Sequence, residues 1–206
     1  MKKHIGIIGL GDMGFSMARN ILKAGYQLTG FDLREERLEM LEALGGKRAS
    51  SPAEVGEVAD AVFIMVMTGK QAESIVSGED GLLKTMNPGK TILLTATIEP
   101  HEARSIGKTV AKKGVHLIDA PVSGGQNGAE SGTLALMAAA DKEVWDENLD
   151  LMKAVGENIF HVGEEIGIGQ TVKASLQALI GCTFTAIFES LVLGSKAGVS
   201  GKVLYE

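Results

Sequence analysis

Apolar residues follow two alternating patterns along this chain. Short continuous apolar runs, typical of strands buried on both faces, alternate with stretches in which apolar residues recur at helical spacing. The runs predict strands over residues 5–8, 27–31, 61–67, 90–95, 115–119, 134–139 and 159–162. The other stretches predict helices over residues 13–24, 35–44, 99–113 and 141–155. This alternation favours an α/β fold with a doubly wound, mostly parallel sheet.

Turn and capping residues mark the ends of several predicted elements. Gly25 and the pair Gly45-Gly46 follow predicted helices, where glycine commonly comes after the last turn. The sequence Ser51-Pro52-Ala53-Glu54 predicts a capping box with proline at the first helical position. Residues 120–132 are rich in glycine and serine, and we expect them to form a loop.

The last predicted helix, residues 167–197, is apolar nearly all round between 178 and 193. Its length suits a membrane span, but its polar residues would be costly in lipid: Gln177, Thr183, Thr185, Glu189 and Ser190. We therefore expect a buried helix, no membrane contact, and a packed thiol at Cys182. A helix of this length extends roughly 45 Å, more than one sheet can cover. We expect the remaining cover to come from another subunit or from a domain absent from this sequence.

Composition limits the class of protein. The 206 residues suit one large domain, or one domain plus part of another. A net charge of -6 without a basic stripe argues against a nucleic-acid partner. The single cysteine fits a reducing compartment, and Met1-Lys2-Lys3 passes directly into the first predicted strand without a signal peptide. The expected location is therefore cytoplasmic.

A glycine-rich turn stands between the first predicted strand and helix. It reads Gly9-Leu10-Gly11-Asp12-Met13-Gly14, and Asp32 ends the second predicted strand 18 residues beyond Gly14. In a dinucleotide site of the Rossmann type the three glycines allow the tight turn, the approach of the pyrophosphate and the packing of helix on strand. The pyrophosphate lies at the helix N-terminus, where N–H groups are free. This order of elements predicts a dinucleotide cofactor.

The residues after the second strand bear on which dinucleotide binds. Asp32 can accept hydrogen bonds from both ribose hydroxyls of NAD, and its charge would repel the 2′-phosphate of NADP. Arg34 and Arg37 follow it and are able to bind that phosphate instead, so NAD is favoured and NADP stays open. Val66 and Met67, at the end of the run 61–67, complete the candidate cofactor contacts on this side. We find no candidate metal ligands.

Two later segments carry candidate chemistry. Residues 119–125, Asp-Ala-Pro-Val-Ser-Gly-Gly, place a serine and glycine amides just past a strand end, where a carboxylate can bind. Residues 167–173, Gly-Ile-Gly-Gln-Thr-Val-Lys, place Lys173 near a helix N-terminus with Gln177 on the same face. Burial and the helix dipole would lower the pKa of this lysine, as a general acid/base requires. Considered alone, an ordinary loop and a surface lysine are the simpler interpretations.

Together these segments resemble the β-hydroxyacid dehydrogenase family, whose best-known member is 3-hydroxyisobutyrate dehydrogenase. The matching pieces occur in the family's order: GLGDMG at 9–14, TATIEP at 95–100, DAPVSGG at 119–125 and GIGQTVK at 167–173. The resemblance implies that Lys173 is the catalytic acid/base and that Thr97 contacts the cofactor near the nicotinamide. It also implies that Ser123, Gly124 and Gly125 bind the substrate carboxylate.

The chain departs from the commonest family pattern. Gln177 stands where relatives usually have Asn, as in the L-threonate dehydrogenase branch, and it is still able to hydrogen-bond a substrate hydroxyl. Ala96 replaces a serine beside Thr97, which removes one cofactor hydrogen bond. Family members continue into an all-helical domain. We therefore expect a dinucleotide-binding domain over residues 1–164, then over 165–206 the long interdomain helix and the start of a truncated helical domain.

The implied function is hydride transfer between NAD(P) and the hydroxyl-bearing carbon of a small 3-hydroxy acid. Candidate substrates are 3-hydroxyisobutyrate, L-threonate and glycerate, or the matching semialdehyde in the reverse direction. Reductive amination by imine reductase relatives fits less well, because those usually lack a lysine at the position of Lys173. The alternative of another class is a catalytically silent dinucleotide-binding module that forms homo-oligomers through the long helix.

Overall fold

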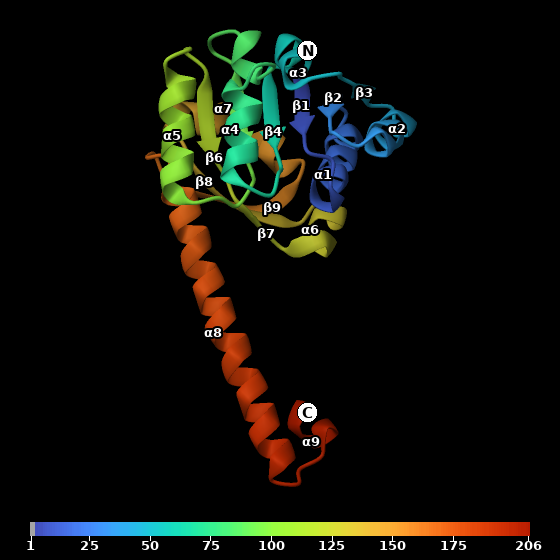
Figure 1. Cartoon of the computed structure of the whole chain (residues 1–206), viewed down its shortest axis with the longest axis vertical. Helices are drawn as coiled ribbons and strands as arrows, with labels where there is room; N and C mark the ends of the chain where they lie inside the picture. The colour runs from blue at the N-terminus through green and yellow to red at the C-terminus, as the bar shows by residue number, and fades with distance from the viewer. Residues whose placement is uncertain (1–2) are drawn as a thin grey trace.

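The computed structural model describes residues 3–206, which form a mixed sheet of nine strands with helices on both faces and one long helix that leaves it (Figure 1). The strands are β1 (His4–Ile8), β2 (Gln27–Phe31), β3 (Lys47–Arg48), β4 (Ala61–Ile64), β5 (Thr91–Leu94), β6 (His116–Asp119), β7 (Val122–Ser123), β8 (Leu134–Ala139) and β9 (Gly156–Gly163). The helices are α1 (Asp12–Lys23), α2 (Glu35–Ala43), α3 (Pro52–Val58), α4 (Gly69–Ser77), η1 (Leu82–Lys84), α5 (Pro100–Ala111), α6 (Gly125–Ser131), α7 (Lys142–Lys153), α8 (Ile168–Lys196) and α9 (Gly201–Tyr205).

The strand order confirms the predicted doubly wound sheet. Strands run β3-β2-β1-β4-β5-β6 in parallel, and β8 then joins β6 in antiparallel orientation. Beyond β6, β8 also pairs antiparallel with β7 and parallel with β9. The order reverses between β1 and β4, so the loops that follow these two strands diverge to opposite faces. A crevice for a ligand forms at such a point, outside the carboxyl ends of the strands.

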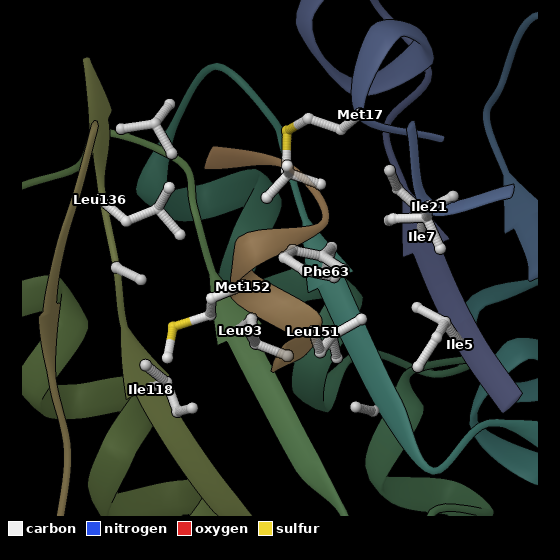
Figure 2. Packing of buried hydrophobic residues seen from close by; sticks show 14 of the residues in the cluster. Ile5, Ile7, Met17, Ile21, Phe63, Leu93, Ile118, Leu136, Leu151 and Met152 are labelled. Carbon is white, nitrogen blue, oxygen red and sulfur yellow. The ribbon is translucent and has the colours of Figure 1, made fainter. Parts of the chain in front are cut away.

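The core lies on both faces of the sheet, because alternate residues of each strand point to opposite sides. On one face, side chains from β1, β4, β5, β6 and β8 pack against α1 and α7 (Figure 2). Phe63 and Leu93 lie at the centre of this cluster, with Leu151 of α7 beside them and Met152 of α7 between Leu93 and Ile118 (Figure 2). On the other face, Val62, Ile64 and their neighbours pack against α3, α4 and α5. Burial on both faces explains the continuous apolar runs.

Most element boundaries agree with the sequence pattern. The predicted strands 27–31 and 134–139 are confirmed to the residue. The run 61–67 forms a strand only to Ile64, since its partners β1 and β5 end opposite this residue. The predicted capping box is half right: Ser51 accepts the N–H of Glu54, but the Glu54 carboxylate accepts the N–H of Ser50. Helix α4 was not predicted, although Thr68 and Gln71 form a complete capping box before it.

The prediction of a loop over 120–132 is wrong, because β7 and α6 lie there. Strand β7 exists through pairing with β8, and α6 through packing on α1. Asn20 Nδ2 donates to the carbonyl of Ala129 at 2.7 Å, and Arg19 Nη2 donates to that of Glu130 at 3.1 Å. These carbonyls lie in the last turn of α6, where helix acceptors lack intrahelical partners. Tertiary contacts thus order a segment whose composition favours a loop.

The expectation of a buried C-terminal helix is wrong within residues 3–206. Helix α8 extends away from the sheet, and α9 folds back against its far end (Figure 1). Of its 29 residues only Gly169, Gln170 and Lys173 are buried, and Cys182 is an exposed free thiol. Its apolar side chains are exposed, with Phe184 at 55% and Phe188 at 61%. By length and composition alone α8 is also able to cross a membrane, which is weak evidence for a span.

Candidate dinucleotide site and buried lysine

A cavity of about 920 Å³ lies at the point where the strand order reverses. It is lined by the glycine turn, the ends of β2 and β4, and one side of α4. Every predicted cofactor residue except Leu10 and Thr97 lines it: Gly9, Gly11, Asp12, Met13, Gly14, Asp32, Arg34, Val66 and Met67. Leu10 is fully buried beneath the turn, and Thr97 is exposed elsewhere on the surface. The structure thus brings together residues from three separate parts of the sequence.

The three glycines of the turn are required for different reasons. Gly9 has φ +92°, and a Cβ there would lie 2.1 Å from the carbonyl oxygen of Met65. A Cβ on Gly14 would lie 1.9 Å from the carbonyl oxygen of Gly9. Close packing between the turn, β4 and α1 therefore explains these two glycines without any ligand.

Gly11 is different, because neither its conformation nor its packing requires glycine. Its φ of -62° and ψ of -174° suit any residue, and the nearest atom to an added Cβ would be Arg34 Nη2 at 4.0 Å. The space before its backbone is open to the cavity. Gly11 is also the N-cap of α1 and offers no side-chain cap, which leaves the first N–H groups of this helix for an anion. These features fit the pyrophosphate of a dinucleotide.

Asp32 is held in place by the turn and by Arg34. Its Oδ2 accepts the N–H of Leu10 at 2.7 Å, and its Oδ1 accepts Arg34 N at 2.9 Å and Nε at 3.0 Å. Burial acts to raise the pKa of Asp32, but these hydrogen bonds outweigh it and the pKa lies below its ordinary value. The carboxylate is therefore charged at neutral pH. Arg34 must move aside before both carboxylate oxygens can accept ribose hydroxyls, while Arg37 donates to Asp12 at 3.1 Å.

The candidate acid/base lies in the second turn of α8. Lys173 is only 8% exposed, and burial lowers the pKa of its ammonium group below the ordinary lysine value. Desolvation penalises the charged form, so a neutral amine is more accessible here than at the surface. Gln177, one turn further, is exposed.

The predicted carboxylate-binding segment lies at the junction of β7 and α6. Ser123 is half-buried, and Gly124 and Gly125 are exposed with φ of +126° and +61°. Only glycine adopts such values readily, so the backbone conformation accounts for this residue type. None of these three residues lines the dinucleotide cavity.

Two buried polar residues in the quoted motifs had no predicted role. Asp119 is 0% exposed at the end of β6, and Gln170 is 1% exposed in the first turn of α8. Gln170 Nε2 donates to Asp119 Oδ1 at 2.8 Å, and Gln170 Oε1 accepts the N–H of Ile98 at 3.0 Å. The signal in the sequence that could have found Asp119 is an acidic residue at the end of an apolar strand.

Comparisons with known proteins agree with this arrangement. Residues 4–163 match the NAD binding domain of 6-phosphogluconate dehydrogenase. Over its whole length the chain is 36% identical to an L-threonate dehydrogenase of Cupriavidus necator and covers 69% of it. Over 204 residues it is 39% identical to an NAD-dependent L-serine dehydrogenase of Pseudomonas aeruginosa, a match that covers 99% of this chain and 68% of that protein.

A solved structure matches as well. The structure of 3-hydroxyisobutyrate dehydrogenase from Salmonella typhimurium has a TM-score of 0.88 and 32% identity, over 99% of this chain and 71% of that one. The chain thus spans about two thirds of the length of the curated relatives it matches. It carries an NAD(P)-binding domain.

Proposed function

The chain belongs to the β-hydroxyacid dehydrogenase family, and we propose that it is an NAD(P)-dependent oxidoreductase of small 3-hydroxy acids. The observation that carries the proposal is Lys173, a buried lysine with a lowered pKa on a helix whose first turn is bonded to Asp119 at the end of β6. Because β6 is parallel to β1, this end lies at the same carboxyl edge of the sheet as the dinucleotide turn. In the proposal residues 1–164 hold the cofactor, and α8 contributes the acid/base.

Each end of the dinucleotide has its own residues in this proposal. Gly11 and the N-terminus of α1 hold the pyrophosphate, Asp32 holds the adenosine ribose, and Thr97 contacts the nicotinamide end. The charge on Asp32 favours NAD, although Arg34 beside it is able to bind a 2′-phosphate. When bound, the cofactor supplies a hydride acceptor for oxidation and a hydride donor for reduction.

The substrate is held by polar groups of this chain. Ser123 and the amides of Gly124 and Gly125 bind the carboxylate, and Gln177 donates to or accepts from a hydroxyl. Neutral Lys173 Nζ accepts the hydroxyl proton during oxidation and returns it during reduction. Holding the carboxylate fixes the distance between the reacting hydroxyl and Nζ.

Gln177 also bears on which hydroxy acid is used. Its amide lies one methylene further out than the Asn usual in the family, so it suits a substrate with additional hydroxyls. L-Threonate is therefore the first candidate, followed by 3-hydroxyisobutyrate and glycerate. The matching semialdehydes are the candidates for the reverse direction.

We further propose that the chain forms a homo-oligomer through α8. The exposed apolar side chains of this helix include Leu179, Phe184 and Phe188, at 64%, 55% and 61% exposure. Large contiguous apolar surfaces of this kind mark interaction sites. A catalytically silent module that dimerises in this way is the competing interpretation, and turnover decides between the two.

A substrate panel tests the proposal. Purified protein is assayed with L-threonate, 3-hydroxyisobutyrate, glycerate and 4-hydroxybutyrate, each with NAD and with NADP. We expect turnover of at least one acid, and loss of turnover with cofactor binding intact in Lys173→Ala. Cofactor binding without turnover of any acid or semialdehyde would support the silent module instead.

A further inference from the structure

The first turn of α8 is capped by a side chain from another element. Its N-cap, Gly167, has φ +99° and no side chain to accept the helix N–H groups. Asp119 Oδ2 accepts them instead, from Gly167 N at 2.9 Å and from Gln170 N at 3.2 Å. A carboxylate at the N-terminus of a helix of 29 residues also interacts favourably with the helix dipole. The start of α8 is thus fixed to the end of β6.

Gln170 extends this connection to a third segment. Its Nε2 donates both to Asp119 Oδ1 at 2.8 Å and to the carbonyl of Ala96 at 3.1 Å, while its Oε1 accepts the N–H of Ile98 at 3.0 Å. All three side-chain bonds are buried. The two backbone groups flank Thr97, whose own side chain is exposed. One amide therefore holds the loop on both sides of Thr97.

Packing leaves little freedom at this junction. A Cβ on Gly169 would lie 2.5 Å from the carbonyl oxygens of both Asp119 and Met137, so the backbone of α8 lies directly on the end of β6 and on the middle of β8. Lys173 follows Gln170 by three residues and therefore shares its face of the helix. A shift of the first turn would carry Lys173 with it.

We propose that Gln170 and Asp119 are positioning residues that lock the loop around Thr97, the end of β6 and the first turn of α8 into one unit. The lock sets the position of Lys173 Nζ relative to Thr97 before substrate binds. The catalytic consequence of the lock rests on the proposed function. The hydrogen bonds that form the lock do not, because they are present in the protein without cofactor or substrate.

Burial of both residues supports this assignment. Burial raises the pKa of the Asp119 carboxyl above its ordinary value, although N–H donors from Gln170 and Gly167 oppose this. A buried carboxyl of this kind is costly unless its hydrogen bonds are made, so the network is expected to be either intact or disrupted as a whole.

Two variants test the inference. Gln170→Met keeps the length of the side chain and removes its three hydrogen bonds. Asp119→Asn places Nδ2 opposite Gln170 Nε2, donor against donor. Asn148→Leu is the control, because its equally buried amide bonds Val144 and Thr91 at the amino end of β5.

Three readouts separate positioning from stability alone. In Gln170→Met we expect kcat to fall tenfold or more, since misplacement by about 1 Å can cost 100-fold, with the Kd of NADH changed less than twofold. The apparent pKa of the kcat profile should rise toward that of a solvated lysine. Amide hydrogen exchange of Ile98, measured without cofactor, should accelerate at least tenfold. Asp119→Asn should lower kcat and accelerate Ile98 exchange in the same direction as Gln170→Met, and Asn148→Leu should lower Tm without altering kcat or its pH profile.

Failure of this inference differs from failure of the proposed function. If Gln170→Met accelerates Ile98 exchange but the wild-type protein turns over no hydroxy acid, the lock is supported and the proposed dehydrogenase function is refuted. Unchanged Ile98 exchange in Gln170→Met overturns the lock. So does unchanged kcat in that variant when the wild type is active.

Discussion

Replacing Gly11 by alanine separates the requirements of the fold from those of the ligand. The added Cβ has no neighbour closer than 4.0 Å, and the backbone angles are allowed for alanine. Two opposing effects on stability remain. Alanine stabilises the fold by about 0.4–1 kcal/mol because it lowers the conformational entropy of the unfolded chain. It destabilises the fold by a similar amount because it is a poorer N-cap than glycine. The free energy of unfolding should therefore change by less than about 1 kcal/mol, and Tm by less than about 4 °C.

The same Cβ projects into the space proposed for the pyrophosphate. If one hydrogen bond between a backbone N–H and a charged phosphate oxygen is lost, the cost is about 1.5–3 kcal/mol. Since about 1.4 kcal/mol is a factor of ten in affinity, the Kd of NADH should rise about 10- to 150-fold. The prediction is thus a large loss of binding at nearly constant stability.

NADH fluorescence titration and thermal unfolding measure the two quantities on the same samples. Gly181→Ala is the matched control, because a Cβ there meets nothing within 4 Å and lies on the exposed part of α8. We expect Gly181→Ala to raise stability slightly and to leave the Kd unchanged. Wild-type affinity in Gly11→Ala would refute the placement of the pyrophosphate, and a fall in Tm beyond about 4 °C would refute the argument that packing leaves this position free.

Four further predictions concern the glycine turn, Asp32 and Lys173. Gly14→Ala should lower the free energy of unfolding by about 1–3 kcal/mol, and Tm with it, because its Cβ would lie 1.9 Å from the carbonyl oxygen of Gly9. An unchanged thermal unfolding curve would contradict this packing. Asp32→Ala should shift the ratio of NAD to NADP affinity at least tenfold toward NADP, since the 2′-phosphate then meets Arg34 without the opposing charge, and paired titrations check this. Lys173→Met should lower kcat about 10²- to 10⁴-fold at unchanged NADH affinity. In the wild type, the rate of oxidation should rise with pH through an apparent pKa below that of an ordinary lysine, because burial lowers the pKa of Lys173 and the neutral amine is the base. The rate of reduction should fall over the same range.

The sequence predicts those features whose causes are local or periodic. Central parallel strands give continuous apolar runs, and β2 and β8 are therefore found to the residue. The glycine turn and Asp32 lie within 32 residues of the start and form one structural unit, which makes their association predictable. By contrast α6 depends on Asn20 in a helix more than 100 residues earlier. No local pattern contains that contact.

The same distinction separates Lys173 from the residues around it. Its position in a motif can be recognised, whereas the bonds from Gln170 to Asp119 and Ala96 span 51 and 74 residues and exist only in the folded chain. The exposed length of α8 is the converse case. The apolar character of the helix is plain from the sequence, and it predicts that another surface packs against these side chains. No part of residues 3–206 provides that surface.

Helix α8 therefore has two parts with different physical constraints. Its first turn is fixed by Asp119 and Gln170 to the sheet that holds the dinucleotide cavity, while the turns beyond Lys173 extend into solvent. Lys173 lies at the boundary and is the last buried residue of the helix. Cofactor binding should consequently depend on the sheet domain alone, because every residue lining the cavity precedes β5. The proposed substrate contact Gln177 lies instead on the exposed part, so substrate selection depends on whatever packs against α8.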